Sequence, residues 1–176
     1  AGDLDAVVLA LSGLRRLGLE HCASEVLDLE TMLPAPAQGA LAVEARAGED
    51  SVELARAVAV LDDDPTRLAV TAERAIMARL GAGCAAPVGA WAHLRGGEQE
   101  QRVLVLRAVV TSLDGGQEVG CELSTELHEA SGGPGAPGNT AAVRAAEALG
   151  ARAAEVLLED GAAQIVDLHA NKPRRD

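Results

Sequence analysis

Residues 62–83 read DDDPTRLAVTAERAIMARLGAG and carry the clearest local structural signals in the chain. An aspartate followed by proline is typical of a helix start, because the carboxylate caps the first turn and proline suits the first helical position. We therefore expect Asp64 to be the N-cap of a helix that begins at Pro65. Apolar side chains at helical spacing extend this helix to about Leu80, where the following glycines end it.

An antiparallel sheet and a second long helix are predicted to follow this first helix. The predicted strands cover residues 88–94, 103–113 and 118–125. Gly-Gly and Asp-Gly turns join them, as in a meander of hairpins. Asn139 or Thr140 then begins a helix that continues to Glu159, and residues 163–168 form a last strand or a short helix. This order of elements predicts an α+β fold with a three-stranded antiparallel sheet and helices packed on it.

The first 60 residues do not form a closed domain in this reading. Residues 4–11 (LDAVVLAL) fit a buried strand that turns into a short helix over residues 12–17 and stops at Gly18. A continuous helix from 4 to 17 is the alternative, and the periodicity does not decide between the two. Residues 40–46 are predicted to form a strand and residues 52–61 a helix. The chain also begins with alanine, not methionine, and we expect it to be a piece of a longer protein.

Composition excludes several classes of function. The chain has 176 residues, 48% of them hydrophobic and 24% charged, which is typical of globular proteins. A net charge of -12 argues against nucleic acid as a partner, and the absence of Phe and Tyr argues against base stacking. No apolar run approaches the roughly 18 residues of a membrane span. No signal peptide opens the chain, and we expect a cytoplasmic protein that contacts no membrane.

Cysteine usage agrees with a reducing compartment. Cys22, Cys84 and Cys121 are odd in number and far apart, and no CxxC motif occurs, so neither a disulfide framework nor a metal site is expected. Cys84 lies among small residues, in the segment GAGCAAPVG (residues 81–89), where the space could admit a bulky covalent adduct. A buried cysteine packed under a glycine-rich turn is the alternative, and spacing alone makes it the commoner case.

Arginines are the candidate anion-binding residues, because the single lysine lies in the terminal tail. The candidates are Arg15, Arg16, Arg46 and Arg74. Arg15 and Arg16 cannot both face one site, since adjacent residues on a helix point about 100° apart. Each arginine taken alone is more often a solvated surface residue than a ligand.

Three motifs resemble the hydroxymethylbilane synthase family, also called the porphobilinogen deaminases. Residues 33–46, LPAPAQGALAVEAR, resemble the family motif LPAPGQGALAVECR. Residues 71–75 and 80–90 resemble TAERA…L.GGC..PVGA, and residues 5–18 resemble DAI.LA..GL.RLG. The motifs occur in the family's order, and the resemblance covers the whole chain but only about the second half of the family's length.

The resemblance implies a three-domain parent whose first two domains resemble the lobes of a periplasmic binding protein. On this basis residues 1–40 are the end of the second, substrate-side domain and residues 41–60 are a return segment of the first domain. Residues 61–176 are the C-terminal α+β domain that carries the cofactor. The family is usually monomeric.

The resemblance also implies a transferase activity in haem and tetrapyrrole biosynthesis. The family joins four porphobilinogen units, with loss of ammonia, into hydroxymethylbilane on a dipyrromethane primer that a thioether attaches to a cysteine. Cys84 matches this cysteine, and Arg16, Arg46 and Arg74 match arginines at the cofactor or substrate site. Arg16 and Gln38 are implied substrate-binding residues, and no metal is implied.

Two departures from the family pattern matter for this chain. Ala37 replaces the first glycine of PGQG, and it would strain the loop if the position requires a positive φ. The family's catalytic aspartate lies in the first domain, so no catalytic residue is expected in this fragment, which should be inactive alone. The alternatives are a non-catalytic, ACT-like module that binds a small ligand or a protein, and a cysteine-dependent hydrolase, for which the sequence fixes no histidine near Cys84.

Overall fold

The computed structural model describes residues 4–45, 52–83, 85–96, 101–127 and 140–169 of the chain. The chain divides into two compact units, Ala1–Met32 and Leu33–Asp176. The first unit contains α1 (Leu11–Arg16) and the short 3-10 helix η1 (Glu20–Cys22). The second contains α2 (Val52–Ala59), α3 (Asp64–Leu80), β1 (Val88–Arg95), β2 (Arg102–Thr111), β3 (Glu118–Leu127), α4 (Thr140–Glu159) and α5 (Ala162–Ile165).

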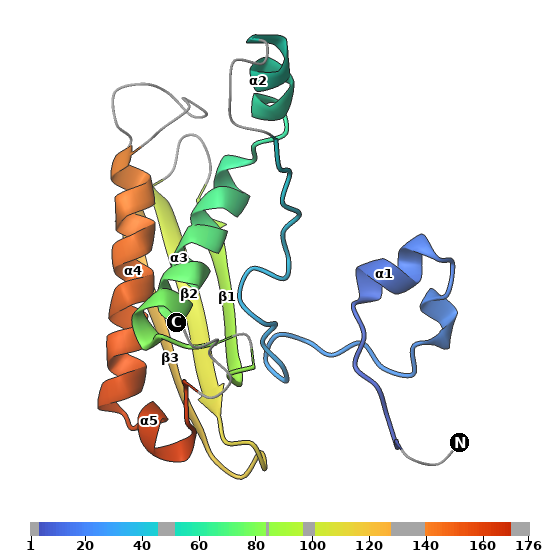
Figure 1. The fold of residues 1–176 in the computed structure, drawn as a ribbon, viewed down its shortest axis with the longest axis vertical. Coiled ribbons are helices and arrows are strands. Elements are labelled where there is room, and N and C mark those ends of the chain that lie inside the picture. Colours follow the sequence, from blue (N-terminus) through green and yellow to red (C-terminus); the bar gives the residue numbers. More distant parts are fainter. Residues whose placement is uncertain (1–3, 46–51, 84, 97–100, 128–139, 170–176) are drawn as a thin grey trace, which may run out of the picture. The chain divides into compact units, whose positions relative to one another are not determined.

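The second unit has the predicted α+β architecture. Its sheet has the order β1-β2-β3, and both strand pairs are antiparallel. Helices α3 and α4 lie side by side over one face of this sheet (Figure 1). The core between the layers contains the fully buried side chains of Leu68, Ile76, Leu104, Leu106 and Leu157. Residues 163–168 were predicted to form a strand or a short helix, and the helix is confirmed as α5, Ala162–Ile165.

Helix α3 and helix α4 approach each other closely at Gly150. A Cβ atom built on Gly150 would collide with the carbonyl oxygen of Ala72 and the side chain of Ala75. Small residues at this crossing therefore let α3 and α4 pack closely against each other while both also pack on the sheet.

Helix α3 begins one residue earlier than expected. Asp63, not Asp64, is the N-cap, and its carboxylate accepts a hydrogen bond from the Thr66 N–H at 2.9 Å. Asp64 occupies the first helical position, where it forms 2.6 Å ion pairs with Arg67 and Arg102. Any of the three consecutive aspartates has a side chain that could cap the helix. Asp63 is the cap because its backbone is extended, and an N-cap residue has non-helical φ and ψ.

Two predicted strands are absent from the described residues. Residues 4–10 have no regular secondary structure, so neither a buried strand nor a helix from 4 to 17 forms, whereas the short helix predicted over residues 12–17 is confirmed as α1, Leu11–Arg16. Residues 40–45 are not a strand either, and Leu41 is 89% exposed. The physical reason is that a strand needs a neighbour for its N–H and C=O groups, and the alternation of apolar residues cannot supply one. Arg46 lies outside the described residues.

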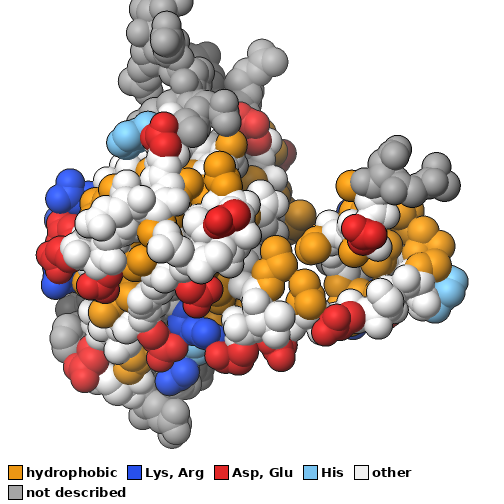
Figure 2. Space-filling view, turned by 90° about the horizontal axis from the view of Figure 1, so that it is seen from below, with side chains coloured by type: hydrophobic (Ala, Val, Ile, Leu, Met, Phe, Trp, Pro, Cys, Tyr) orange, Lys and Arg blue, Asp and Glu red, His pale blue; other side chains and the backbone are white. Residues whose placement is uncertain are grey.

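Apolar side chains of the first unit remain at its surface. Leu4 is 76% exposed, and Val7, Val8 and Leu9 are also exposed. Figure 2 shows hydrophobic side chains gathered on the visible surface of this unit. The apolar run predicted to form a buried strand is therefore exposed over residues 4–10.

The loop at residues 33–40 is attached to α3 and β1 by one buried carboxylate. Glu73 is 7% exposed, and its Oε2 accepts a hydrogen bond from the Ala37 N–H at 2.7 Å. Its Oε1 accepts from the Ala92 N–H at 2.8 Å. The Pro34 carbonyl adds a parallel link, because it accepts from the Ala90 N–H at 2.9 Å. These contacts cover the free edge of β1 with the loop.

Ala37 has the strained backbone that the sequence comparison with the family motif anticipated. Its φ is 65°, and it is the one residue other than glycine with positive φ in the part of the chain that the structure describes. The left-handed conformation places Cβ too close to the following carbonyl and costs an L-residue about 1–2 kcal/mol. The two-bonded Glu73 nevertheless holds the loop in this conformation.

We predict that Ala37→Gly stabilises the chain by about 1 kcal/mol, because glycine relieves the left-handed strain at a small entropic cost in the unfolded state. The measurement is the free energy of unfolding in urea. Ala35→Gly is the matched control in the same loop, where φ is not positive, and it should lower stability. Equal losses for both variants would contradict the strain argument.

We predict that Glu73→Gln lowers the free energy of unfolding by about 1–3 kcal/mol. The amide retains one acceptor oxygen, but its NH₂ group meets a backbone N–H and leaves that donor unpaired. Glu147→Gln on the exposed face of α4 serves as the control and should change stability little. A neutral result for Glu73→Gln would show that the two hydrogen bonds do not hold the loop.

Burial raises the pKa of Glu73 above its ordinary value, although the Ala92 and Ala37 N–H groups oppose the shift. The folded chain then binds this proton more tightly than the unfolded chain, so the contribution of Glu73 to stability falls as pH rises from about 4.5 through the raised pKa. The difference in unfolding free energy between wild type and Glu73→Gln should therefore shrink over this range. A difference that grows with pH would contradict the burial.

Candidate functional site

The loop between α3 and β1 contains the candidate cofactor cysteine. Cys84 itself lies outside the described residues, but the backbone on both sides of it is described. Gly81 ends α3 in the left-handed conformation, with φ 62°, and the Ala82 N–H donates to the Met77 carbonyl at 3.1 Å. The Ala86 N–H donates to the Gly83 carbonyl at 3.0 Å. Backbone hydrogen bonds therefore hold the loop in a tight turn, and the side chains on either side of Cys84 are small.

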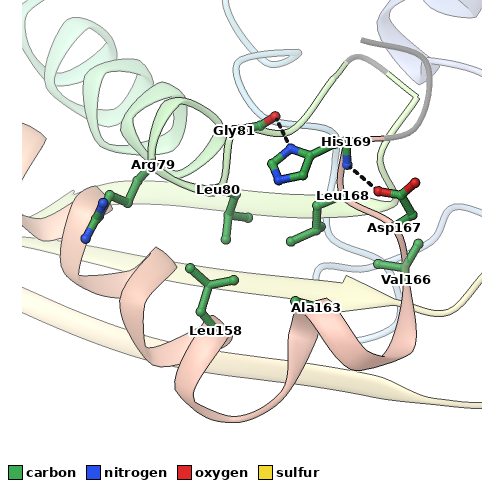
Figure 3. A pocket seen from close by; sticks show the side chains of 9 residues that line it. All are labelled: Arg79, Leu80, Gly81, Leu158, Ala163, Val166, Asp167, Leu168 and His169. Carbon is green, nitrogen blue, oxygen red and sulfur yellow. Dashed lines mark hydrogen bonds between the residues drawn. The ribbon is translucent and has the colours of Figure 1, made fainter.

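The far end of the chain also contacts this loop. The Nδ1 atom of His169 lies 3.0 Å from the Gly81 carbonyl oxygen, as Figure 3 shows. The Gly83 N–H donates to the Leu168 carbonyl at 3.4 Å. At the other end of the loop, the Thr111 N–H of β2 donates to the Pro87 carbonyl at 3.1 Å. The segment that contains Cys84 is therefore held at both ends by parts of the chain distant in sequence.

A cavity of about 370 Å³ lies beneath this contact, between the ends of α3 and α4 and the segment after α5 (Figure 3). Its apolar lining comes from Leu80, Leu158, Ala163, Val166 and Leu168. The polar groups at its rim already have partners within the chain. Arg79 pairs with Glu155 at 3.1 Å, and the His169 backbone N–H donates to Asp167 at 3.0 Å. The interior of the cavity is thus mainly apolar, with these polar groups at its rim.

The candidate anion-binding residues fall in both units. Arg16 is exposed at the end of α1 in the first unit, where its neighbour Arg15 pairs with Glu20 at 2.8 Å. Arg74 is exposed on α3 in the second unit, and Gln38 is exposed in the loop at residues 33–40. Glu73 holds that loop against α3, so the backbone segments of Gln38 and Arg74 are tied together. The convergence of Arg16, Arg46, Arg74 and Cys84 on one cleft stays a prediction.

The two described cysteines differ in their surroundings. Cys121 lies on the core side of β3 with Val119 and Leu123, as the alternation along that strand predicted. Burial raises the pKa of its thiol, which weakens it as a nucleophile. Cys22 is exposed at the end of η1. Neither residue lies in a loop of small residues like the one around position 84.

Within the ranges that the structure describes, no helix is long and apolar enough to cross a membrane. No group of three or more His, Cys, Asp or Glu side chains among those same residues could hold a metal ion. The Asp62–Asp64 run serves helix capping and ion pairing instead.

Sequence reasoning overlooked two residues that organise the site. Glu73 could have been found, because it shares the helical face of Ile76 and Leu80, three and seven residues further on, where a buried carboxylate requires partners. His169 carries no such signal, since its contact with Gly81 spans 88 residues. Only the path of the chain through α4 and α5 brings these two residues together.

Comparisons with known proteins cover most of the chain. Residues 1–54 match a family model described as porphobilinogen deaminase, dipyromethane cofactor binding domain, and residues 67–159 match the porphobilinogen deaminase C-terminal domain. The porphobilinogen deaminase of Cutibacterium acnes is 51% identical over 177 residues, which cover 98% of this chain and 50% of that protein. The porphobilinogen deaminase of Thermobifida fusca is 47% identical over 166 residues, covering 94% of this chain and 48% of the relative.

A third relative, porphobilinogen deaminase 1 of Streptomyces coelicolor, is 45% identical over 171 residues, covering 94% of this chain and 48% of that protein. The chain therefore spans about half the length of the curated relatives that it matches. With one family model covering more than half of its residues and another covering most of the remainder, this chain belongs to the porphobilinogen deaminase family.

Proposed function

We propose that this chain is the C-terminal half of a hydroxymethylbilane synthase, the transferase that joins four porphobilinogen units with loss of ammonia. The observation that carries this proposal is the 51% identity over 98% of the chain to a porphobilinogen deaminase. The alternative of an ACT-like binding module shares the α+β core but gives no role to the motif around Cys84. We further propose that the parent protein acts as a monomer in the cytoplasm.

The residues around the loop fit a covalently attached dipyrromethane. A group with several carboxylates needs open space and cationic side chains, and arginine binds carboxylates through two parallel hydrogen bonds. Ala85 is exposed beside Cys84, and Arg74 is exposed on the helix that leads into the loop. We therefore assign Cys84 to attachment, and Arg16, Arg46 and Arg74 to binding the carboxylates of the cofactor. Arg16 and Gln38 contact substrate in this proposal.

The residues of this chain bind and orient the reacting groups. Cys84 supplies the sulfur nucleophile that forms the thioether with a methylene carbon; its thiol gives up the proton, and the bond from that carbon to the amino group breaks as ammonia leaves. The C-terminal end of α3 precedes this cysteine, and its dipole is negative there, so positive charge for a thiolate has to come from arginines. The attached group supplies the pyrrole position to which substrate units are added. The aspartate that assists loss of ammonia belongs to the N-terminal half, so we expect this half to be inactive alone.

Exposed apolar side chains before α2 support the proposed domain assignment. We place residues 1–40 at the end of a second domain, residues 41–60 in a return segment of the first, and residues 61–176 in the cofactor-carrying domain. The first two domains would resemble the lobes of a periplasmic binding protein. Leu4 and Leu41 are 76% and 89% exposed, as expected for segments whose neighbouring strands belong to the other half of the parent.

We predict that Cys84→Ser abolishes the covalent dipyrromethane in the full-length parent, because serine lacks the sulfur nucleophile. Intact mass and the colour reaction with Ehrlich's reagent measure the adduct. Cys22→Ser and Cys121→Ser are the matched controls and should retain it fully. An adduct that persists in Cys84→Ala would overturn the assignment of Cys84, whereas a wild-type parent that carries no adduct would favour the binding-module alternative.

We predict that Arg74→Ala lowers substrate turnover of the parent at least tenfold, since a charge-assisted pair with a carboxylate contributes about 1.5–3 kcal/mol. Arg79→Ala, five residues along the same helix, removes a surface ion pair with Glu155 and should have little effect. Turnover of porphobilinogen, measured by consumption of the substrate, compares the two variants. Equal effects would place Arg74 on the outer surface and remove it from the site.

A further inference from the structure

Leu168 and His169, which follow α5, contact the loop that carries Cys84. We propose that the Leu168 carbonyl and the His169 imidazole form a C-terminal clamp that positions the loop carrying Cys84. This inference rests on the proposed function, because only a loop that bears the reactive thiol requires positioning. His169 acts through the loop backbone and is a positioning residue, not a catalytic one.

The chemistry of the clamp follows from its atoms. The Gly81 carbonyl can only accept a hydrogen bond, so Nδ1 of His169 carries the hydrogen and donates across the 3.0 Å distance. The Leu168 carbonyl accepts from the Gly83 N–H at 3.4 Å. The two bonds fall on either side of Ala82, within the three residues that precede Cys84. They fix the direction in which the backbone leaves α3.

The clamp is itself anchored in the core. Leu168 is 4% exposed and belongs to the hydrophobic cluster beneath the sheet. The backbone N–H of His169 donates to the Asp167 carboxylate, which orients the segment. Gly161, with φ 98°, is the N-cap of α5. After α5 the chain runs back toward the end of α3, where His169 meets Gly81 (Figure 3). The segment anchored in the core is therefore hydrogen-bonded to the loop. The other hydrogen bonds near the start of the loop join residues that are close in sequence.

Positioning matters because the carbon–sulfur bond of the thioether forms, and the methylene carbon loses its amino group as ammonia, only when the sulfur is held close to that carbon. Fixing the loop before reaction removes part of the entropy that would otherwise be lost in the transition state. The loop consists of Gly, Ala and Pro apart from Cys84, so it has no large side chain to pack in place. The clamp supplies the restraint that such side chains would give.

The test uses the full-length parent produced without porphobilinogen, so that Cys84 carries no adduct. Porphobilinogen is then added, and the rate of adduct formation is followed by intact mass. We expect His169→Ala to slow this rate about fivefold, equivalent to about 1 kcal/mol. His169→Asn should restore it to within about twofold, because the Asn amide can donate in place of Nδ1. His21→Ala, at an exposed histidine of the first unit, is the control.

A second measurement does not depend on the cofactor. Iodoacetamide alkylation of Cys84 in the protein without adduct, followed by peptide mass and referenced to Cys22, should be about fivefold faster in His169→Ala because the loop is no longer restrained at Gly81. Val119→Ala, which weakens the core on β3 without touching the loop, separates positioning from general loss of stability. It should lower the melting temperature and leave both rates near those of wild type.

The outcomes distinguish the clamp from the proposed function. If wild type forms the adduct and neither rate changes in His169→Ala, the clamp is wrong and the proposed function stands. The clamp is also overturned if His169→Ala and Val119→Ala change the rates of adduct formation and alkylation to the same extent for the same loss of melting temperature. If wild type forms no adduct at Cys84, the proposed function fails, and the alkylation rates still decide whether His169 restrains the loop.

Discussion

The buried carboxylate of Glu73 is the contact on which the arrangement around the site depends. It joins three segments, since the side chain starts on α3 and accepts one hydrogen bond from the loop at residues 33–40 and one from the edge of β1. A buried charge is costly, and burial raises the pKa of this group accordingly. Two backbone N–H donors offset that cost because they too would be unpaired without Glu73. The carboxylate and the two donors therefore require one another.

The family motifs that are separate in the sequence meet in space around this carboxylate. Pro34 and Ala37 belong to the first motif, Glu73 to the second, and Gly89 to the end of the second. The Pro34 carbonyl pairs with β1 next to Gly89, where a Cβ atom would lie 2.9 Å from the side chain of Leu33. The motifs thus encode a junction between a loop, a helix and an edge strand, and this explains why Ala37 is held at positive φ despite its strain.

Local signals were sufficient to predict most of the second unit from the sequence. The proline near the start of α3, the glycine at its end and the Asp-Gly turn before β3 each act within a few residues, and Gly115 indeed has φ 70°. The N-cap was misplaced by one residue because three adjacent aspartates give the same signal. Residues 4–11 and 40–46 were assigned to strands on apolar pattern alone, which cannot provide a hydrogen-bonding neighbour. The Glu73 and His169 contacts depend on tertiary structure, and the sequence alone could not predict them.

The distribution of charge explains why the cysteine loop cannot constitute a site alone. Residues 81–87 contain no cationic side chain, and the loop is restrained by backbone bonds and by the imidazole of His169. Carboxylates bound beside this loop would have to be neutralised by arginines on other elements, and Arg74 on α3 is the candidate within the same unit. Arg16 belongs to the other unit, Ala1–Met32. In the proposed site, covalent attachment and neutralisation of the carboxylates therefore depend on different elements of the chain.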